Sequence, residues 1–229
     1  MAGKPLCSQP CFLIARASRI PSPLGGSRNL CVSPPTTRLC DVSAQFEVIT
    51  ISLSFVLGLS MAHMLWSAAS AVRARNELIL HWLPFIWAIG ILLHHLQFWF
   101  AALTTDRQID QWTWSWYLHL FFMALLLFAS GALVLPSESQ QRAGDLLADF
   151  RQHGRLALVP LAAYQFLWIP TNYRGGSELL AVGNLANVLL GALILVGFTA
   201  ASRPVQYGAA LLYTAGVTWA TLFVWAPIL

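Results

Sequence analysis

The sequence predicts an all-α polytopic membrane protein, a bundle of six transmembrane helices preceded by a disordered N-terminal tail. Six stretches lack Asp, Glu, Lys and Arg, and they cover residues 48–72, 78–105, 111–137, 156–173, 179–202 and 204–229. Each approaches or exceeds the ~20 apolar residues that a helix needs to cross a ~30 Å hydrocarbon core. With 57% apolar and 10% charged residues, the chain has too little polar surface for a soluble globule. The apolar runs also lack the alternation of β-barrel strands.

The first 45 residues differ from the rest and are expected to form the disordered tail. They hold six of the twelve prolines and no acidic residue before Asp41. The apolar run 11–15 is too short for a secretory signal, and the prolines would break the amphipathic helix of a transit peptide. The spacing of the four cysteines fits neither a zinc ribbon nor an iron–sulfur motif, so no metal site is expected at Cys7, Cys11, Cys31 and Cys40. We interpret the tail as an extension upstream of the true start.

Residues 46–229 are expected to form one transmembrane domain, with spans near residues 48–71, 80–103, 113–135, 156–173, 179–201 and 205–227. The fourth span is the weakest, because Pro160 lies inside it and Pro170 near its end, so a kink or a shortened crossing is expected. Before this span, from Asp145 to Arg151, apolar residues recur at helical spacing and charged residues lie between them. This pattern predicts a short interfacial helix, with an amphipathic lead-in to the fourth span as the alternative.

The basic residues of the connections predict the orientation, because cytoplasmic loops carry the excess of Lys and Arg. One side holds six arginines, namely Arg73, Arg75, Arg142, Arg151, Arg155 and Arg203. The other side holds Arg107 and Arg174, and exceeds six only if the tail residues Lys4, Arg16, Arg19, Arg28 and Arg38 are counted. Without the tail, the bias places both termini outside. Six tryptophans then mark the outer interface as membrane anchors, namely Trp99, Trp112, Trp114, Trp116, Trp168 and Trp225.

The segment from Phe46 to Pro136 resembles the front half of a family of small, uncharacterised multi-pass bacterial membrane proteins. The resemblance rests on the segment from Gly58 to His63, on Trp82-Leu83-Pro84 and on the segment from Gln97 to Phe100. It implies a location in the bacterial inner membrane. The family has no assigned activity, so the resemblance implies no catalytic residue.

Four histidines lie well inside the expected spans, where an ionisable side chain is costly and usually points into the bundle. The short loop after the second span makes the second and third helices antiparallel neighbours. His119 would then approach His94 or His95, and such a pair would suit haem or a metal. Because His94 and His95 project about 100° apart, only one of them faces a given partner. The favoured interpretation for these three residues and His63 is hydrogen bonding across helices or snorkelling to the interface.

Other polar residues inside the spans favour helix packing. Asn184 and Asn187 share one face of the fifth span, and we expect them to form interhelical hydrogen bonds. Ser54, Gly58 and Ala62 repeat the small-residue spacing of closely packed helices. The same polar residues also motivate a proton or ion path, which the lack of intramembrane carboxylates weakens.

The sequence supports three classes of function unequally. A small permease-like or partner-binding membrane component is favoured, with the lipid bilayer and a membrane protein or a second copy as partners. The alternative is a membrane redox protein that binds haem or a metal through His94, His95 and His119. An enzyme is least favoured, because Ser60 and Ser67 near His63 have no nucleophile elbow and no orienting acid. Nucleic acid is not an expected partner, because the basic residues lie singly or in pairs between apolar spans.

Overall fold

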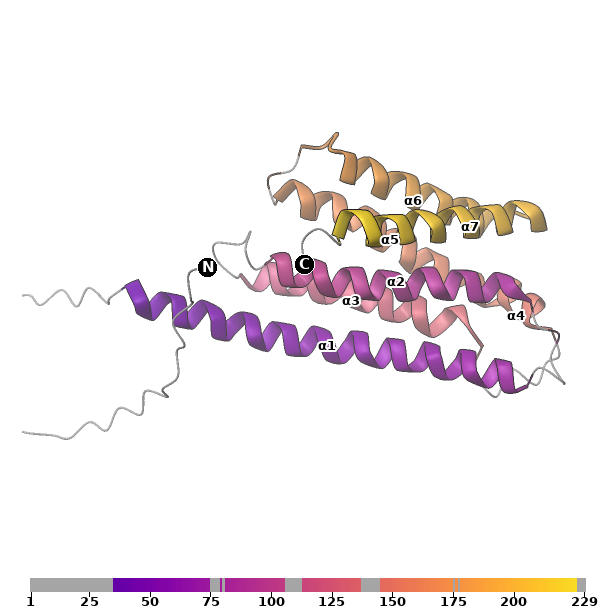
Figure 1. Cartoon of the computed structure of the whole chain (residues 1–229), viewed down its shortest axis with the longest axis horizontal. Coiled ribbons are helices and arrows are strands. Elements are labelled where there is room, and N and C mark those ends of the chain that lie inside the picture. Colours follow the sequence, from indigo (N-terminus) through magenta and orange to yellow (C-terminus); the bar gives the residue numbers. More distant parts are fainter. Residues whose placement is uncertain are drawn as a thin grey trace, which may run out of the picture.

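The computed structural model describes residues 35–74, 79, 81–105, 113–136, 145–174, 176 and 178–225, with side chains from Val48 onward except at 103–105 and 223–225. Its helices are α1 (Pro35–Arg73), α2 (Trp82–Thr105), α3 (Trp114–Val134), α4 (Leu146–Gln152), the 3₁₀ segment η2 (Gly154–Ala157), α5 (Leu158–Arg174), α6 (Val182–Thr199), α7 (Arg203–Trp219) and the π-helical segment η3 (Ala220–Trp225). The predicted all-α class is confirmed (Figure 1).

Among the described residues, four helices are long and apolar enough to cross a membrane, within Val48–Arg73, Trp82–Ala102, Trp114–Val134 and Val182–Thr199. Large apolar side chains cover the outside of the bundle, and Phe55, Leu189 and Leu212 are among those exposed. So large an exposed apolar area would be unfavourable for a soluble monomer in water, whereas lipid acyl chains would cover it. The chain is therefore a multi-pass integral membrane protein.

Helix α1 begins at Pro35 and so includes residues 35–45, which the sequence assigned to the tail. Proline is tolerated in the first turn of a helix, where its missing N–H has no carbonyl partner to lose, and no proline follows within α1. Residues 1–34, with three of the four cysteines, lie outside the described residues, as do Arg75, Arg107, Arg142 and Trp112.

The short helix expected between Asp145 and Arg151 is present as α4. The Asp145 carboxylate caps it by accepting hydrogen bonds from the Leu147 and Ala148 N–H groups at 2.8 Å and 3.3 Å. Its apolar face, which consists of Leu146, Leu147 and Phe150, is buried. After η2, α5 begins at Leu158, so Pro160 falls in its first turn and breaks no helical hydrogen bond.

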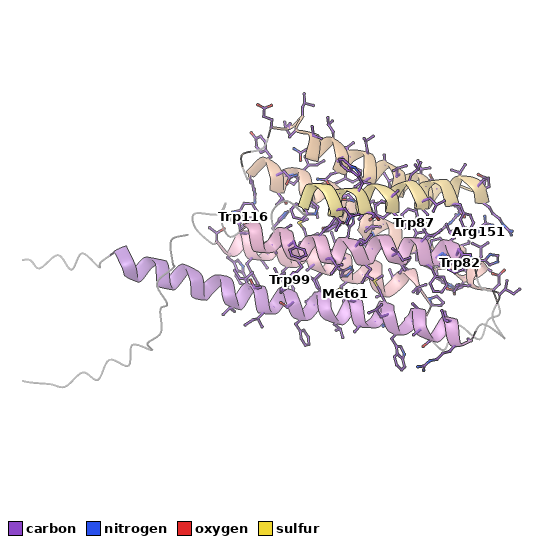
Figure 2. The ribbon with its side chains drawn as sticks, viewed as in Figure 1. Met61, Trp82, Trp87, Trp99, Trp116 and Arg151 are labelled. Atoms are coloured by element: carbon purple, nitrogen blue, oxygen red, sulfur yellow. The ribbon has the colours of Figure 1, made fainter. Side chains whose placement is uncertain are left out.

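The long helices run alternately up and down (Figure 1). Helices α2 and α3 form the middle of the bundle, with α1 packed on α3 and α2, α7 packed on α2, and α5 packed on α3. Helix α6 contacts α5 and α7 and lies farthest from α1. We call the two ends of the bundle the Arg151 end and the Trp116 end, because these residues mark opposite ends in Figure 2.

Glycine permits a close approach between α1 and α3. A Cβ atom added at Gly131 of α3 would lie 2.6 Å from Ser60 Oγ and 2.8 Å from Met64 Sδ of α1. The small residues predicted to pack, Gly58 and Ala62, instead lie on the exposed face of α1, and no described atom lies within 4 Å of a Cβ added at Gly58. That prediction is wrong within this bundle, because the α1 face that contacts α3 contains Ser60 and Met64.

Replacing Gly131 with Ala is expected to lower the free energy of unfolding by about 1–3 kcal/mol, because overpacking displaces Ser60 or Met64. Gly58→Ala is the matched control, and its gain in helix propensity should leave stability unchanged or raise it by up to about 1 kcal/mol. Thermal unfolding of the detergent-purified variants measures both. Equal effects of the two substitutions would contradict the α1–α3 contact described above.

Candidate functional site

The most polar part of the core surrounds His94 on α2, a residue that is 3% exposed. His94 Nδ1 lies 2.8 Å from Gln97 Oε1, one turn along α2. His94 Nε2 lies 2.6 Å from Gln165 Nε2, which comes from α5. Gln97 Nε2 in turn donates to Val217 O at 3.0 Å and to Thr221 Oγ1 at 2.7 Å. One hydrogen-bonded chain therefore joins α5, α2 and the end of α7.

The direction of these bonds defines the protonation of His94. An amide nitrogen only donates, so Gln165 donates to Nε2 and the imidazole proton lies on Nδ1, where it is donated to the Gln97 carbonyl oxygen. This arrangement corresponds to a neutral imidazole. This series of hydrogen bonds therefore connects three helices through side chains that carry no formal charge.

Two tyrosines enclose the His94 ring. The ring centroids of Tyr164 on α5 and Tyr213 on α7 lie 5.5 Å and 5.6 Å from that of His94. Both tyrosines are buried, and the Tyr213 hydroxyl has no hydrogen-bond partner among the described residues. We call His94, Gln97, Gln165, Tyr164 and Tyr213 the His94 centre. The centre combines amide, imidazole and hydroxyl groups with aromatic faces.

The local sequence explains why Tyr213 can reach this position. Gly90 lies one turn before His94 on the same face of α2, and a Cβ added there would lie 2.7 Å from Tyr213 Cε1. The missing side chain therefore lets α7 approach α2. Trp87, also on α2, packs on Tyr213 with ring centroids 5.2 Å apart and borders the centre toward the Arg151 end.

His95 points to a different helix, as the angle between consecutive helical residues requires. Its Nδ1–H donates to Ile91 O at 2.8 Å, and its Nε2 accepts from Ser60 Oγ on α1 at 2.9 Å. Ser60 was expected near His63, but the Ser60 hydroxyl bonds to His95. His63 is half-buried and makes no hydrogen bond to the described residues.

His119 on α3 is hydrogen-bonded to α5. Its Nε2 lies 2.7 Å from Thr171 Oγ1, and that hydroxyl donates at 2.8 Å to Leu167 O. Gln165 and Thr171 are six residues apart on α5, which separates them by ~9 Å along the helix axis. The expected neighbour relation between α2 and α3 is present, yet the hydrogen bonds of His94, His95 and His119 lead to three different partner residues.

The Trp116 end carries a second polar group of contacts. Asn172 at the end of α5 donates to Asn184 Oδ1, and Asn184 Nδ2 donates to Glu178 O, both at 2.9 Å. These bonds join α5 to the start of α6 and to the turn between them. Asn187 is half-buried and makes no hydrogen bond to the described residues. Arg174 lies over the Trp116 ring, with its guanidinium carbon 5.5 Å from the ring centroid.

No three His, Cys, Asp or Glu residues among the described residues are grouped closely enough to hold a metal ion. Comparison with protein-family models, curated protein sequences and solved structures gives no match.

The site residues predicted from the sequence did not include Gln165, Gln97, Tyr164 or Tyr213. A signal existed for the two glutamines, since an amide side chain inside an apolar span is costly and marks a functional or packing contact. For the tyrosines no such signal exists, because aromatic residues are common in membrane helices. Only the approach of α5 and α7 to α2 assembles them around His94.

The Gln165–His94 bond is expected to contribute measurably to stability. Gln165→Leu and His94→Ala should each destabilise the bundle, and a double-mutant cycle should give a coupling of about 0.6–1.7 kcal/mol, the range for hydrogen bonds between membrane helices. Thr199→Val is the control, because Thr199 is exposed and its hydroxyl donates only to Leu195 O in its own helix. Additive effects of the two core substitutions in thermal unfolding would contradict this contact.

Proposed function

We propose that this protein is a six-span inner-membrane protein of bacteria that acts as a small permease-like component, and that the His94 centre binds a small uncharged polar solute. Four of the spans are the membrane-length helices. The other two would be α5 and α7, each of 17 residues, extended by the adjoining segments η2 and η3. The bacterial location rests on the family resemblance of residues 46–136.

The arginine distribution supports an orientation with the Arg151 end in the cytoplasm. Arg73, Arg151, Arg155 and Arg203 lie at that end, whereas Arg174 lies at the Trp116 end. An excess of arginine on one side is the pattern of cytoplasmic loops. Trp114 and Trp116 would then anchor the opposite, outer interface.

The observation that carries the proposed function is the assembly of a polar, uncharged centre inside the hydrocarbon region. Buried polar groups in membrane helices are expensive and concentrate at substrate sites. The described contacts of the His94 centre include no carboxylate, ammonium or guanidinium group. A formally charged solute would therefore leave its charge uncompensated, whereas amide, imidazole and hydroxyl groups match an uncharged solute with hydrogen-bond donors and acceptors.

The surroundings favour access from the Trp116 end. The hydrogen-bonded chain continues in that direction through Gln97 to Thr221, and the His119–Thr171 pair lies on the same side of the centre. Toward the Arg151 end the core contains buried apolar side chains, including Leu83, Trp87 and Leu158. In the proposed orientation a solute would thus reach the centre from outside.

Transport by the purified protein in liposomes tests this proposal. We expect passage of small uncharged solutes, such as urea, glycerol or short amides, above the rate in empty liposomes. His94→Ala combined with Gln165→Leu should reduce that passage at least 10-fold, and Thr199→Val should leave it unchanged. Rates equal to those of empty liposomes for every uncharged solute tested would sink the permease proposal and leave partner binding as the alternative.

Haem binding through His119 and His94 or His95 stays a prediction of the sequence. His94 and His95 each have both ring nitrogens in hydrogen bonds, so ligation would have to break at least one of them. Absorbance of the purified protein tests this alternative directly. A stoichiometric Soret band that disappears in His119→Ala would establish the redox function, whereas a colourless protein would count against it.

A further inference from the structure

Two arginines bond to the same turn at the Arg151 end, which Arg151 marks in Figure 2. Arg155, in η2, donates from Nη2 to Ala200 O at 2.6 Å, and Arg151, on α4, donates from Nη2 to Ala201 O at 3.4 Å. Both carbonyls belong to the turn between α6 and α7. Gln206 supports this turn, because its Nε2 donates to Ala200 O at 2.8 Å. The two guanidinium groups are therefore fixed at one turn rather than free in solvent.

The positive charge at this turn has no acidic partner among the described residues. The two acidic side chains at α4 lie next to histidines instead, with Asp145 Oδ1, at the N-cap, 3.7 Å from His81 Nε2, and Asp149 Oδ1, within α4, 3.2 Å from His153 Nδ1. The two guanidinium groups bond to adjacent carbonyls of the turn, and like charges held this close repel each other. The repulsion between the two positive charges is unfavourable, and a bound anion would reduce it.

Hydrogen-bond donors also remain unused at this turn. The Nε atoms of both arginines are buried without a partner among the described residues, and the carbonyls of the turn engage only their Nη2 atoms. Helix α7 begins in the same turn, and its N-cap residue Ser202 makes no side-chain capping hydrogen bond. The N–H groups and positive dipole end of this helix therefore add to the arginine charge.

Exposed apolar side chains flank the arginines. Leu156 follows Arg155 directly, Val159 lies one turn farther along the helix, and Val205 lies in the first turn of α7; all three are exposed. A soluble anion gains nothing from contact with apolar side chains, whereas a phospholipid presents a phosphate group together with acyl chains that can pack on them. The combination favours a lipid over a free phosphate.

We propose that Arg151, Arg155 and the first turn of α7 form a binding site for the phosphate group of an anionic phospholipid, with Leu156, Val159 and Val205 against its acyl chains. The site lies at the end of the bundle and does not depend on solute binding at the His94 centre. It would attach α4 to the membrane surface and fix η2 against the α6–α7 turn.

Lipid retention by the detergent-purified full chain tests the site. Native mass spectrometry with added phosphatidylglycerol should show one retained lipid, and phosphatidylcholine should be retained at least 10-fold less. Arg151→Gln combined with Arg155→Gln should reduce phosphatidylglycerol retention at least 10-fold. Arg174→Gln, which removes an arginine at the opposite end, is the matched control and should retain the lipid as the unaltered protein does.

Three outcomes would overturn the proposal. They are equal retention of the two lipids, unchanged retention in the double variant, and protection from thermal unfolding by inorganic phosphate equal to that by phosphatidylglycerol. The last outcome would assign the site to a soluble phosphate compound. If the double variant does not fold, Arg155→Lys keeps the charge but loses the planar donor pair, and it should lower retention several-fold; unchanged retention there would also contradict the proposal.

Discussion

The lack of water in the hydrocarbon core is the constraint on which the rest of this structure depends. Helices satisfy the backbone groups, so a buried polar side chain is stabilised when it finds a partner of its own. Ser52 and Ser54 find theirs in the preceding turn of α1, where their hydroxyls donate to Val48 O and Thr50 O. Imidazole and amide groups reach farther, and His94, His95 and Asn184 bond to other elements. The polar residues therefore help to determine which helices are neighbours.

The His94 centre shows how such pairing becomes specific. Moving α5 by one residue would rotate Gln165 away from His94 by ~100° and leave two polar groups unpaired in an apolar core. Apolar packing alone would tolerate several registers, because leucines and valines replace one another at little cost. Gly90 adds a steric condition, since only a residue without a side chain lets Tyr213 lie at this distance from α2. The hydrogen bonds and the glycine together select one arrangement of α2, α5 and α7.

The two ends of the bundle use their polar residues differently. At the Trp116 end, Arg174 lies on an aromatic ring and Asn172 and Asn184 close the connection between α5 and α6. At the Arg151 end, two guanidinium groups bond to the carbonyls of one turn, and their charge is not neutralised by a described carboxylate. This asymmetry accords with a protein oriented by its arginines and in contact with phosphate groups of the membrane on that side.

The sequence by itself determined the all-α class, four of the six expected membrane-length helices and the short helix after Asp145, because long charge-free runs and an amphipathic pattern are local properties. It also indicated that His94 and His95 face different partners, since that follows from helix geometry. Only the tertiary structure decided that these partners are Gln165 and Ser60, that His119 bonds to Thr171, and that Gly131 rather than Gly58 receives a neighbouring helix. These pairs join residues 35 to 71 positions apart, and their formation depends on the order and rotation of whole helices, which no local pattern of residues specifies.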